Sequence, residues 1–180
     1  DLENLKAEKP VQKSSVIRHM PRWTVPPEGF VKINVDAAIG RNGDHGAGAV
    51  ICRDETGAYR GASAISVSDM VDPGILVAMA SGEALSLAAD LGYQKIQVST
   101  DCAATITHLK GNYNGTSAAV IQDLKRRTHD FVFVEFIHEK REFDLEAHKL
   151  SKAATTLPFG RHVWFQVLPD IICITEKILS

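Results

Sequence analysis

The chain has few cysteines and no long apolar run, and both absences narrow what it can be. Its three cysteines, Cys52, Cys102 and Cys173, are odd in number and lack any CxxC or Cys/His spacing. This argues against a disulfide framework or a structural zinc site and indicates reduced, mostly buried thiols. No apolar run approaches the ~20 residues that span a bilayer, and no basic stretch precedes an apolar core at the N-terminus. We therefore expect an intracellular protein, nuclear or cytoplasmic, with no membrane partner.

A strong charge of one sign is also missing. The formal net charge is −2 and the pI is near 6.4, so no global field would attract a polyanion, and any nucleic-acid contact must come from local patches. The 180 residues, 44% of them hydrophobic, are enough for one domain with a real core. No internal repeat or low-complexity tract is present, and we expect a monomer.

Composition divides the chain into three parts. Residues 1–22 mix charges with Pro10 and Pro21 and have few large apolar groups, which is typical of a linker. Residues 23–156 carry the periodic patterns of a folded domain. Residues 157–180 form an apolar tail around Trp164 and Phe165, which we expect to pack on the domain or to bind a partner as a strand or helix.

Three strands are predicted first, over residues 30–36, 46–53 and 58–67. In the first, Val31, Ile33 and Val35 alternate with polar residues, so Asp36 lies on the face away from these side chains. Residues 54–57 have the composition of a hairpin turn that ends in a left-handed glycine. The three strands are therefore expected to be sequential and antiparallel.

The rest of the pattern alternates helices and strands. The alanine-rich segment 74–91 predicts a helix with Glu83 in its apolar stripe, and Gly92 ends it. A parallel strand over 95–101 places Asp101 at its carboxyl end. Helices follow over 102–110 and 117–129, then a strand over 131–137 that reads as central and buried, then a helix from Asp144, a good N-cap, to Ala154. The predicted fold is α/β, with a mixed five-stranded sheet and helices on both faces.

That order, with aspartates ending the first and fourth strands and a glutamate on the first helix, resembles the ribonuclease H fold. More narrowly, the chain looks like the plant ribonuclease H-like domain that accompanies, or derives from, non-LTR reverse transcriptases. The resemblance covers roughly residues 23–154 and rests on Trp23, 32–38 (KINVDAA), 46–54 (GAGAVICRD), Gly57, 83–84 (EA), 99–101 (STD) and 147–152 (AHKLSK).

The resemblance implies a site for two divalent cations held by carboxylates, which suit Mg²⁺. In this interpretation Asp36 bridges both metals, while Glu83 and Asp101 complete the shell. His148 stands where the family has its fourth carboxylate, which leaves three negative charges facing the four positive charges of two Mg²⁺ ions. Metal occupancy should weaken, although imidazole can still ligate Mn²⁺. All four residues are therefore candidate metal-binding and catalytic residues.

Candidate nucleic-acid contacts come from small local features. Arg141 occupies the position of a mobile histidine in bacterial-type members and can hold a phosphate. Lys125 and Arg126 belong to the charge run 125–127 on a predicted helix, which can equally be a solvated face. Gly46 and Gly48 would let a nucleic-acid backbone approach the second strand closely, or mark a bulge.

Three of the four candidate metal ligands also have a structural interpretation. Asp36 can serve in a strand-end turn, Asp101 can cap the helix that follows it, and His148 can be a half-exposed structural histidine. The leading hypothesis is a metal-dependent endonuclease that hydrolyses the RNA strand of RNA/DNA hybrids. The alternatives are a domesticated, weakly active or inactive nucleic-acid-binding domain and a protein-interaction module that uses the sheet edge or the tail.

Overall fold

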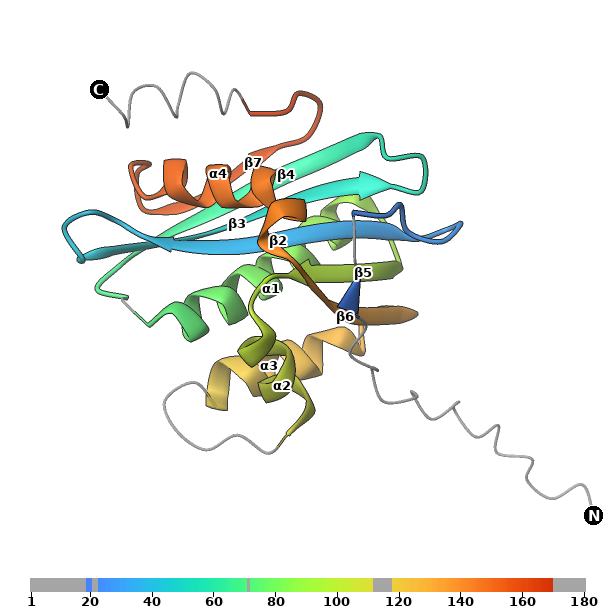
Figure 1. Ribbon diagram of the computed structural model, residues 1–180, viewed down its shortest axis with the longest axis horizontal. Helices are drawn as coiled ribbons and strands as arrows, with labels where there is room; N and C mark the ends of the chain where they lie inside the picture. Colours follow the sequence, from blue (N-terminus) through green and yellow to red (C-terminus); the bar gives the residue numbers. More distant parts are fainter. Residues whose placement is uncertain (1–18, 21–22, 71, 112–117, 170–180) are drawn as a thin grey trace, which may run out of the picture.

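The computed structural model describes residues 19–20, 23–70, 72–111 and 118–169, which form a mixed sheet covered by helices (Figure 1). The sheet has the strand order β1-β6-β5-β2-β3-β4-β7. Its strands are β1 His19–Met20, β2 Val31–Ile39, β3 His45–Asp54, β4 Tyr59–Ser68, β5 Lys95–Thr100, β6 Phe133–Glu139 and β7 Gly160–Trp164. The strands β2, β3 and β4 form the expected antiparallel meander, while β5 and β6 run parallel to β2.

Alternation along β2 separates its two faces. Val31, Ile33 and Val35 are fully buried and pack with residues of α1 (Pro73–Leu91) in the larger core cluster. Side chains at the intervening positions lie on the other face, because successive strand residues point to opposite sides. The turn between β3 and β4 is closed by Asp54, whose carboxylate accepts from the amides of Thr56 and Ala58.

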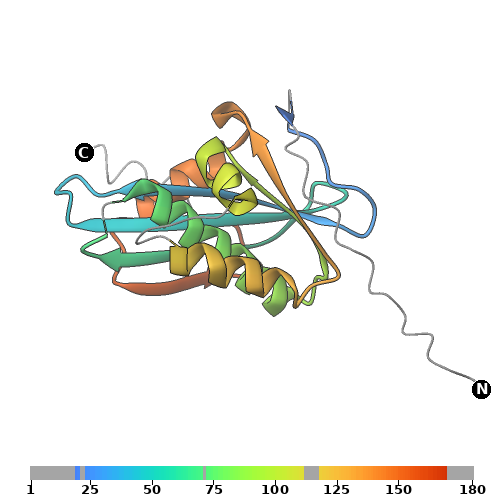
Figure 2. The same cartoon turned by 90° about the horizontal axis from the view of Figure 1, so that it is seen from below.

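The helices cover both faces of the sheet. One face carries α1, α2 (Ala103–Lys110) and α3 (Ala118–Thr128), and the other carries α4 (Leu145–Ala154) over a second, alanine-rich cluster. Figure 2 shows α1 and α3 side by side on the face opposite α4. The helix α1 begins at an N-cap, Asp72, that accepts from the amides of Gly74 and Ile75, and ends at Gly92 with φ 80°.

Two expectations about the sheet need correction. It has seven strands instead of five, because β1 adds to β6 and β7 adds antiparallel to β4. The strand β6 was expected to be central, but it starts at Phe133, which is exposed, and its outer neighbour β1 has only two residues. An apolar run therefore does not by itself place a strand in the middle of a sheet.

The expectation that no segment is apolar enough to cross a membrane was too strict. Within the described residues, α1 has the length and composition to do so. However, 67% of its most apolar window is buried inside the protein, as in a core helix.

Candidate metal centre

Two aspartates lie side by side where two parallel strands separate. The strands β2 and β5 pair as far as Val35 and Thr100, and the next residues are Asp36 and Asp101. Beyond this point β2 continues only along β3, to Ile39. In the sheet, β3 and β4 lie on one side of β2, and β5 and β6 lie on its other side. The strand order therefore reverses direction at β2, which makes this a topological switch point. Ligand sites of open α/β sheets form at such points.

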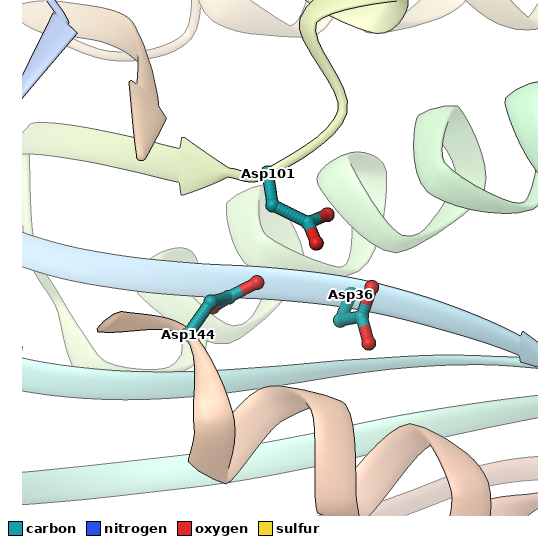
Figure 3. A group of neighbouring side chains, drawn as sticks. All are labelled: Asp36, Asp101 and Asp144. Atoms are coloured by element: carbon teal, nitrogen blue, oxygen red, sulfur yellow. The ribbon is translucent and has the colours of Figure 1, made fainter. Parts of the chain in front are cut away.

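A third aspartate, Asp144, joins them from the start of α4. It follows a short 3₁₀ turn, Arg141–Phe143, and stands directly before α4. One carboxylate oxygen from each of Asp36, Asp101 and Asp144 lies within 4.8 Å of the other two. Figure 3 shows the three side chains reaching the same space from β2, the end of β5 and the start of α4. Asp36 and Asp144 are only 5% and 2% exposed.

The side chain of Asp144 is only partly satisfied by its surroundings. Oδ1 of Asp144 accepts from the amide of Asn34, but Oδ2 is buried without a hydrogen-bond partner among the described residues. Burial, followed by the charges of Asp36, Asp101 and Glu139, raises the pKa of Asp144 well above its usual value. Burial and then Asp36 also raise the pKa of Asp101. An unpaired buried carboxylate oxygen beside two more carboxylates fits a hard divalent cation.

Residues of α4 contact Asp36 directly. Nδ1 of His148 lies 2.7 Å from Oδ2 of Asp36, and the hydroxyl of Ser151 donates to the same oxygen at 3.1 Å. His148 follows Asp144 by one helical turn, so both side chains lie on the face of α4 that looks toward β2. The structure thus brings His148 to Asp36. His148 does not belong to the set of residues whose ligand atoms lie close enough together to hold one ion.

Glu83 does not reach the aspartates, which corrects its expected place in the metal shell. Its carboxylate accepts from the hydroxyl of Ser63 on β4 and from the guanidinium of Arg161 on β7. The physical reason is the position of Glu83 along α1, where the helix crosses over β4. Glu83 is indeed buried, as its place in an apolar stripe indicated, but an arginine from the C-terminal strand is its partner.

The candidate nucleic-acid contacts are dispersed. Arg141 is 66% exposed, and its guanidinium lies 3.4 Å from the carboxylate of Asp101, at the rim of the cluster. Lys125 donates to the carbonyl of Gly111, and Arg126 pairs with Asp123 on the surface of α3. Only Arg141 therefore stands beside the aspartates.

Gly46 and Gly48 lie where α1 packs closely against the sheet. They were expected to let nucleic acid approach the strand, but the structure places the helix over them. A Cβ on Gly48 would lie 2.6 Å from the Cβ of Ala80, and a Cβ on Gly46 would lie 2.7 Å from the side chain of Leu76. Both glycines are buried beneath the helix. Their lack of a side chain serves helix packing.

Sequence reasoning missed the role of Asp144 because it read this residue as a helix cap. Asp144 does occupy the N-cap position, but its side chain makes no capping hydrogen bond. The available signal was its spacing of four residues from His148, which places both on one helix face.

Comparison with known proteins agrees with this architecture. A model of the reverse transcriptase-like family matches residues 34–154, more than half of the chain and a span that includes all three aspartates. A search of curated proteins finds no match.

The similar solved structures are RNase H enzymes or domains. RNase H1 from the archaeon Halobacterium salinarum is 18% identical over 67% of this chain and 93% of its own, with a TM-score of 0.58. An N-terminal RNase H domain from Mycobacterium tuberculosis is 12% identical over 70% and 93%, with a TM-score of 0.64. LC11-RNase H1, isolated from compost and crystallised with an RNA/DNA hybrid, is 18% identical over 67% and 92%, with a TM-score of 0.60. This chain therefore belongs to the reverse transcriptase-like family and has a ribonuclease H-like fold.

Proposed function

We propose that this protein is a metal-dependent endonuclease that hydrolyses the RNA strand of RNA/DNA hybrids. The observation that carries the proposal is the group formed by Asp36, Asp101 and Asp144, with one buried carboxylate oxygen that lacks a hydrogen-bond partner within the described residues. A protein with this fold and no ligand to bind would not be expected to keep three carboxylates together at a switch point, because their mutual repulsion costs stability.

The three aspartates would hold the divalent cations, Mg²⁺ or Mn²⁺. When bound, such ions polarise a scissile phosphate and make water a better nucleophile. The chain's own contribution is to fix the ligands: Asp36 through His148 and Ser151, and Asp144 through Asn34. Because the imidazole of His148 stands beside Asp36 and can ligate Mn²⁺, we expect Mn²⁺ to support activity better than Mg²⁺.

Arg141 would bind the nucleic-acid backbone next to the cleavage point. Its guanidinium is largely exposed and is already within 3.4 Å of Asp101, so a phosphate drawn to bound cations would meet it. The duplex would be recognised by its shape and its 2′-hydroxyls, since the cluster offers no group that reads bases.

Binding without cleavage is the second candidate. It is favoured by the hydrogen-bond contact between the ring of His148 and Oδ2 of Asp36, and by the pairing of Glu83 with Arg161 outside the three-aspartate group. In that case salt-sensitive binding to the hybrid would persist when divalent ions are removed.

A labelled RNA/DNA hybrid separates the two. The purified protein is incubated with Mg²⁺, Mn²⁺ or EDTA, alongside Asp36→Asn and the matched variant Asp123→Asn, which changes an exposed carboxylate on α3. We expect divalent-dependent cleavage that Asp36→Asn lowers by more than about 100-fold, beyond the cost of losing an outer-sphere partner, and that Asp123→Asn leaves intact. Binding with no cleavage under any of these conditions would overturn the enzyme and favour the binder.

A further inference from the structure

A largely buried polar network lies next to the aspartates. Asn34 is two residues before Asp36 on β2 and shares its face of the sheet. Its side-chain amide donates to Oδ1 of Asp144 and to Oε2 of Glu139, each at 3.0 Å. Its carbonyl oxygen accepts from the indole of Trp23 at 3.3 Å. The amide group of Asn34 is therefore held from both ends.

The charge of Glu139 is balanced within the same network. Glu139 is fully buried and accepts from the ammonium group of Lys32, itself 1% exposed, and from the hydroxyl of Ser99 at 2.7 Å. Lys32 also donates to the carbonyl of Thr24 and lies 5.0 Å from the centre of the Trp23 ring. Each charge in this pair is thus satisfied, so the network is well suited to hold a neighbour in place.

The network decides which oxygen of Asp144 is available. Asn34 has two amide hydrogens, which are directed to Glu139 and Asp144 at 3.0 Å each, and the carbonyl oxygen of Phe143 makes a longer contact of 3.5 Å with the same nitrogen. Because the indole of Trp23 can only donate, the side-chain oxygen of Asn34 must face it and the amide nitrogen must face Glu139 and Asp144, which fixes the orientation of Asn34. Oδ1 of Asp144 is engaged, and Oδ2 keeps no partner among the described residues.

We propose that Asn34 is a positioning residue that holds the Asp144 carboxylate with Oδ1 tied to β2 and Oδ2 presented to a divalent cation. The inference rests on the proposed function, since it assigns a role at the same site. Asn34 touches no cation or substrate itself. It acts by fixing a ligand that lies at the start of α4, outside the strands of the sheet.

The chain offers a matched control for this role. Gln97 on β5 is also a buried amide, 7% exposed, and donates to the carboxylate of Glu135 at 3.1 Å. It makes the same kind of bond in the same sheet, but its partner is not one of the clustered aspartates. A purely structural effect of losing a buried amide should therefore appear equally in Gln97→Leu.

The test is the affinity for Mn²⁺ alone, measured by titration calorimetry and by the EPR signal of free Mn²⁺, on the wild type, Asn34→Leu and Gln97→Leu. We expect Asn34→Leu to weaken Mn²⁺ binding by about 10- to 100-fold, the range for loss of an outer-sphere partner. Gln97→Leu should stay within about twofold of the wild type. If Asn34→Leu does not fold, as judged by circular dichroism, Asn34→Ser replaces it as the milder variant.

Each result is decisive. Wild-type affinity in the folded Asn34 variant, or an equal loss in Gln97→Leu, overturns the positioning role while leaving the proposed function standing. No Mn²⁺ binding by the wild type at millimolar concentration overturns the metal centre, and the positioning role with it. Mn²⁺ binding that depends on Asn34 without any cleavage of the hybrid supports the positioning role and rejects the nuclease.

Discussion

Nδ1 of His148 lies 2.7 Å from Oδ2 of Asp36, so an imidazole ring contacts one carboxylate of the three-aspartate group directly. In the resemblance that the sequence shows, this position carries a fourth carboxylate. We expect the ring to stabilise Asp36 when no ion is bound and to weaken the binding of an ion there, because both would compete for Oδ2 of Asp36. Stability without metal and affinity for metal are therefore opposed at this one contact.

Replacing His148 by aspartate should raise the affinity for metal and lower the stability of the metal-free protein. We expect His148→Asp to tighten Mg²⁺ and Mn²⁺ binding by at least about tenfold, since an added charge near 4 Å is worth several kcal/mol at an effective dielectric constant of ~20. The metal-free protein should unfold at a lower temperature, because Asp36 loses a hydrogen bond and gains a like charge. Calorimetry and thermal melts with and without Mn²⁺ measure both effects. His148→Asn, which is neutral, is the control, and equal affinities in all three proteins would contradict the prediction.

Glu83 should prove structural. Glu83→Gln leaves the guanidinium of Arg161 without its buried charge partner, and we expect the free energy of unfolding to fall by roughly 1–3 kcal/mol. Mn²⁺ affinity should stay within about twofold of the wild type, whereas Asp101→Asn should lose it. Urea unfolding and Mn²⁺ titration of the same samples test this, and a Glu83 variant that folds normally but no longer binds Mn²⁺ would return this residue to the metal shell.

The two lysines that lie over aromatic rings should differ sharply in importance. Lys32 is buried against Glu139 and Trp23, so Lys32→Met leaves a buried carboxylate unpaired and should lower the free energy of unfolding by about 3–5 kcal/mol. Lys95 lies 5.8 Å from the centre of the Phe30 ring at the surface, and Lys95→Met should change stability by less than about 0.5 kcal/mol. Denaturant unfolding compares the two variants. A decrease in the free energy of unfolding below about 1 kcal/mol for Lys32→Met would show that the Lys32–Glu139 pair contributes little to stability.

Cys52 should behave as a protonated, unreactive thiol in the folded protein. Burial raises its pKa from 9.0 to about 12, so at pH 8 only ~10⁻⁴ of it is thiolate. We expect iodoacetamide to modify Cys52 only after unfolding, as peptide mass spectrometry would reveal. The folded state disfavours the thiolate, so Cys52 contributes its full share to the free energy of unfolding below pH 9. That contribution is lost as the pH rises from 9 toward 12, because the unfolded state then releases the proton more readily. Rapid modification of Cys52 at pH 8 in the native protein would disprove its burial.

Local patterns predicted the regular elements well. The helix over 74–91 was expected from its apolar stripe and Gly92, and the structure has it over Pro73–Leu91. The strand expected over 95–101 is β5, with Asp101 just past its end. These features depend on neighbouring residues, so sequence periodicity is enough to find them.

The errors arose where partners lie far apart in the chain. Glu83 was correctly read as buried, but its partner Arg161 is 78 residues away and lies in β7, within the tail for which no strand range was predicted. Asp144 was read as a cap because aspartate before a helix usually is one, and its actual partner Asn34 lies 110 residues earlier. Local periodicity predicts whether a side chain is buried, whereas tertiary packing decides which residue it contacts.

The strand β7 has a practical consequence for making this protein. The family match ends at residue 154, yet β4 is ten residues long and its outer backbone pairs with Gly160–Trp164. A chain cut at the family boundary would leave that backbone open to other molecules, and remove the arginine that neutralises Glu83. We expect such a shortened chain to accumulate as insoluble aggregates on expression, and one that extends to residue 169 to stay in solution.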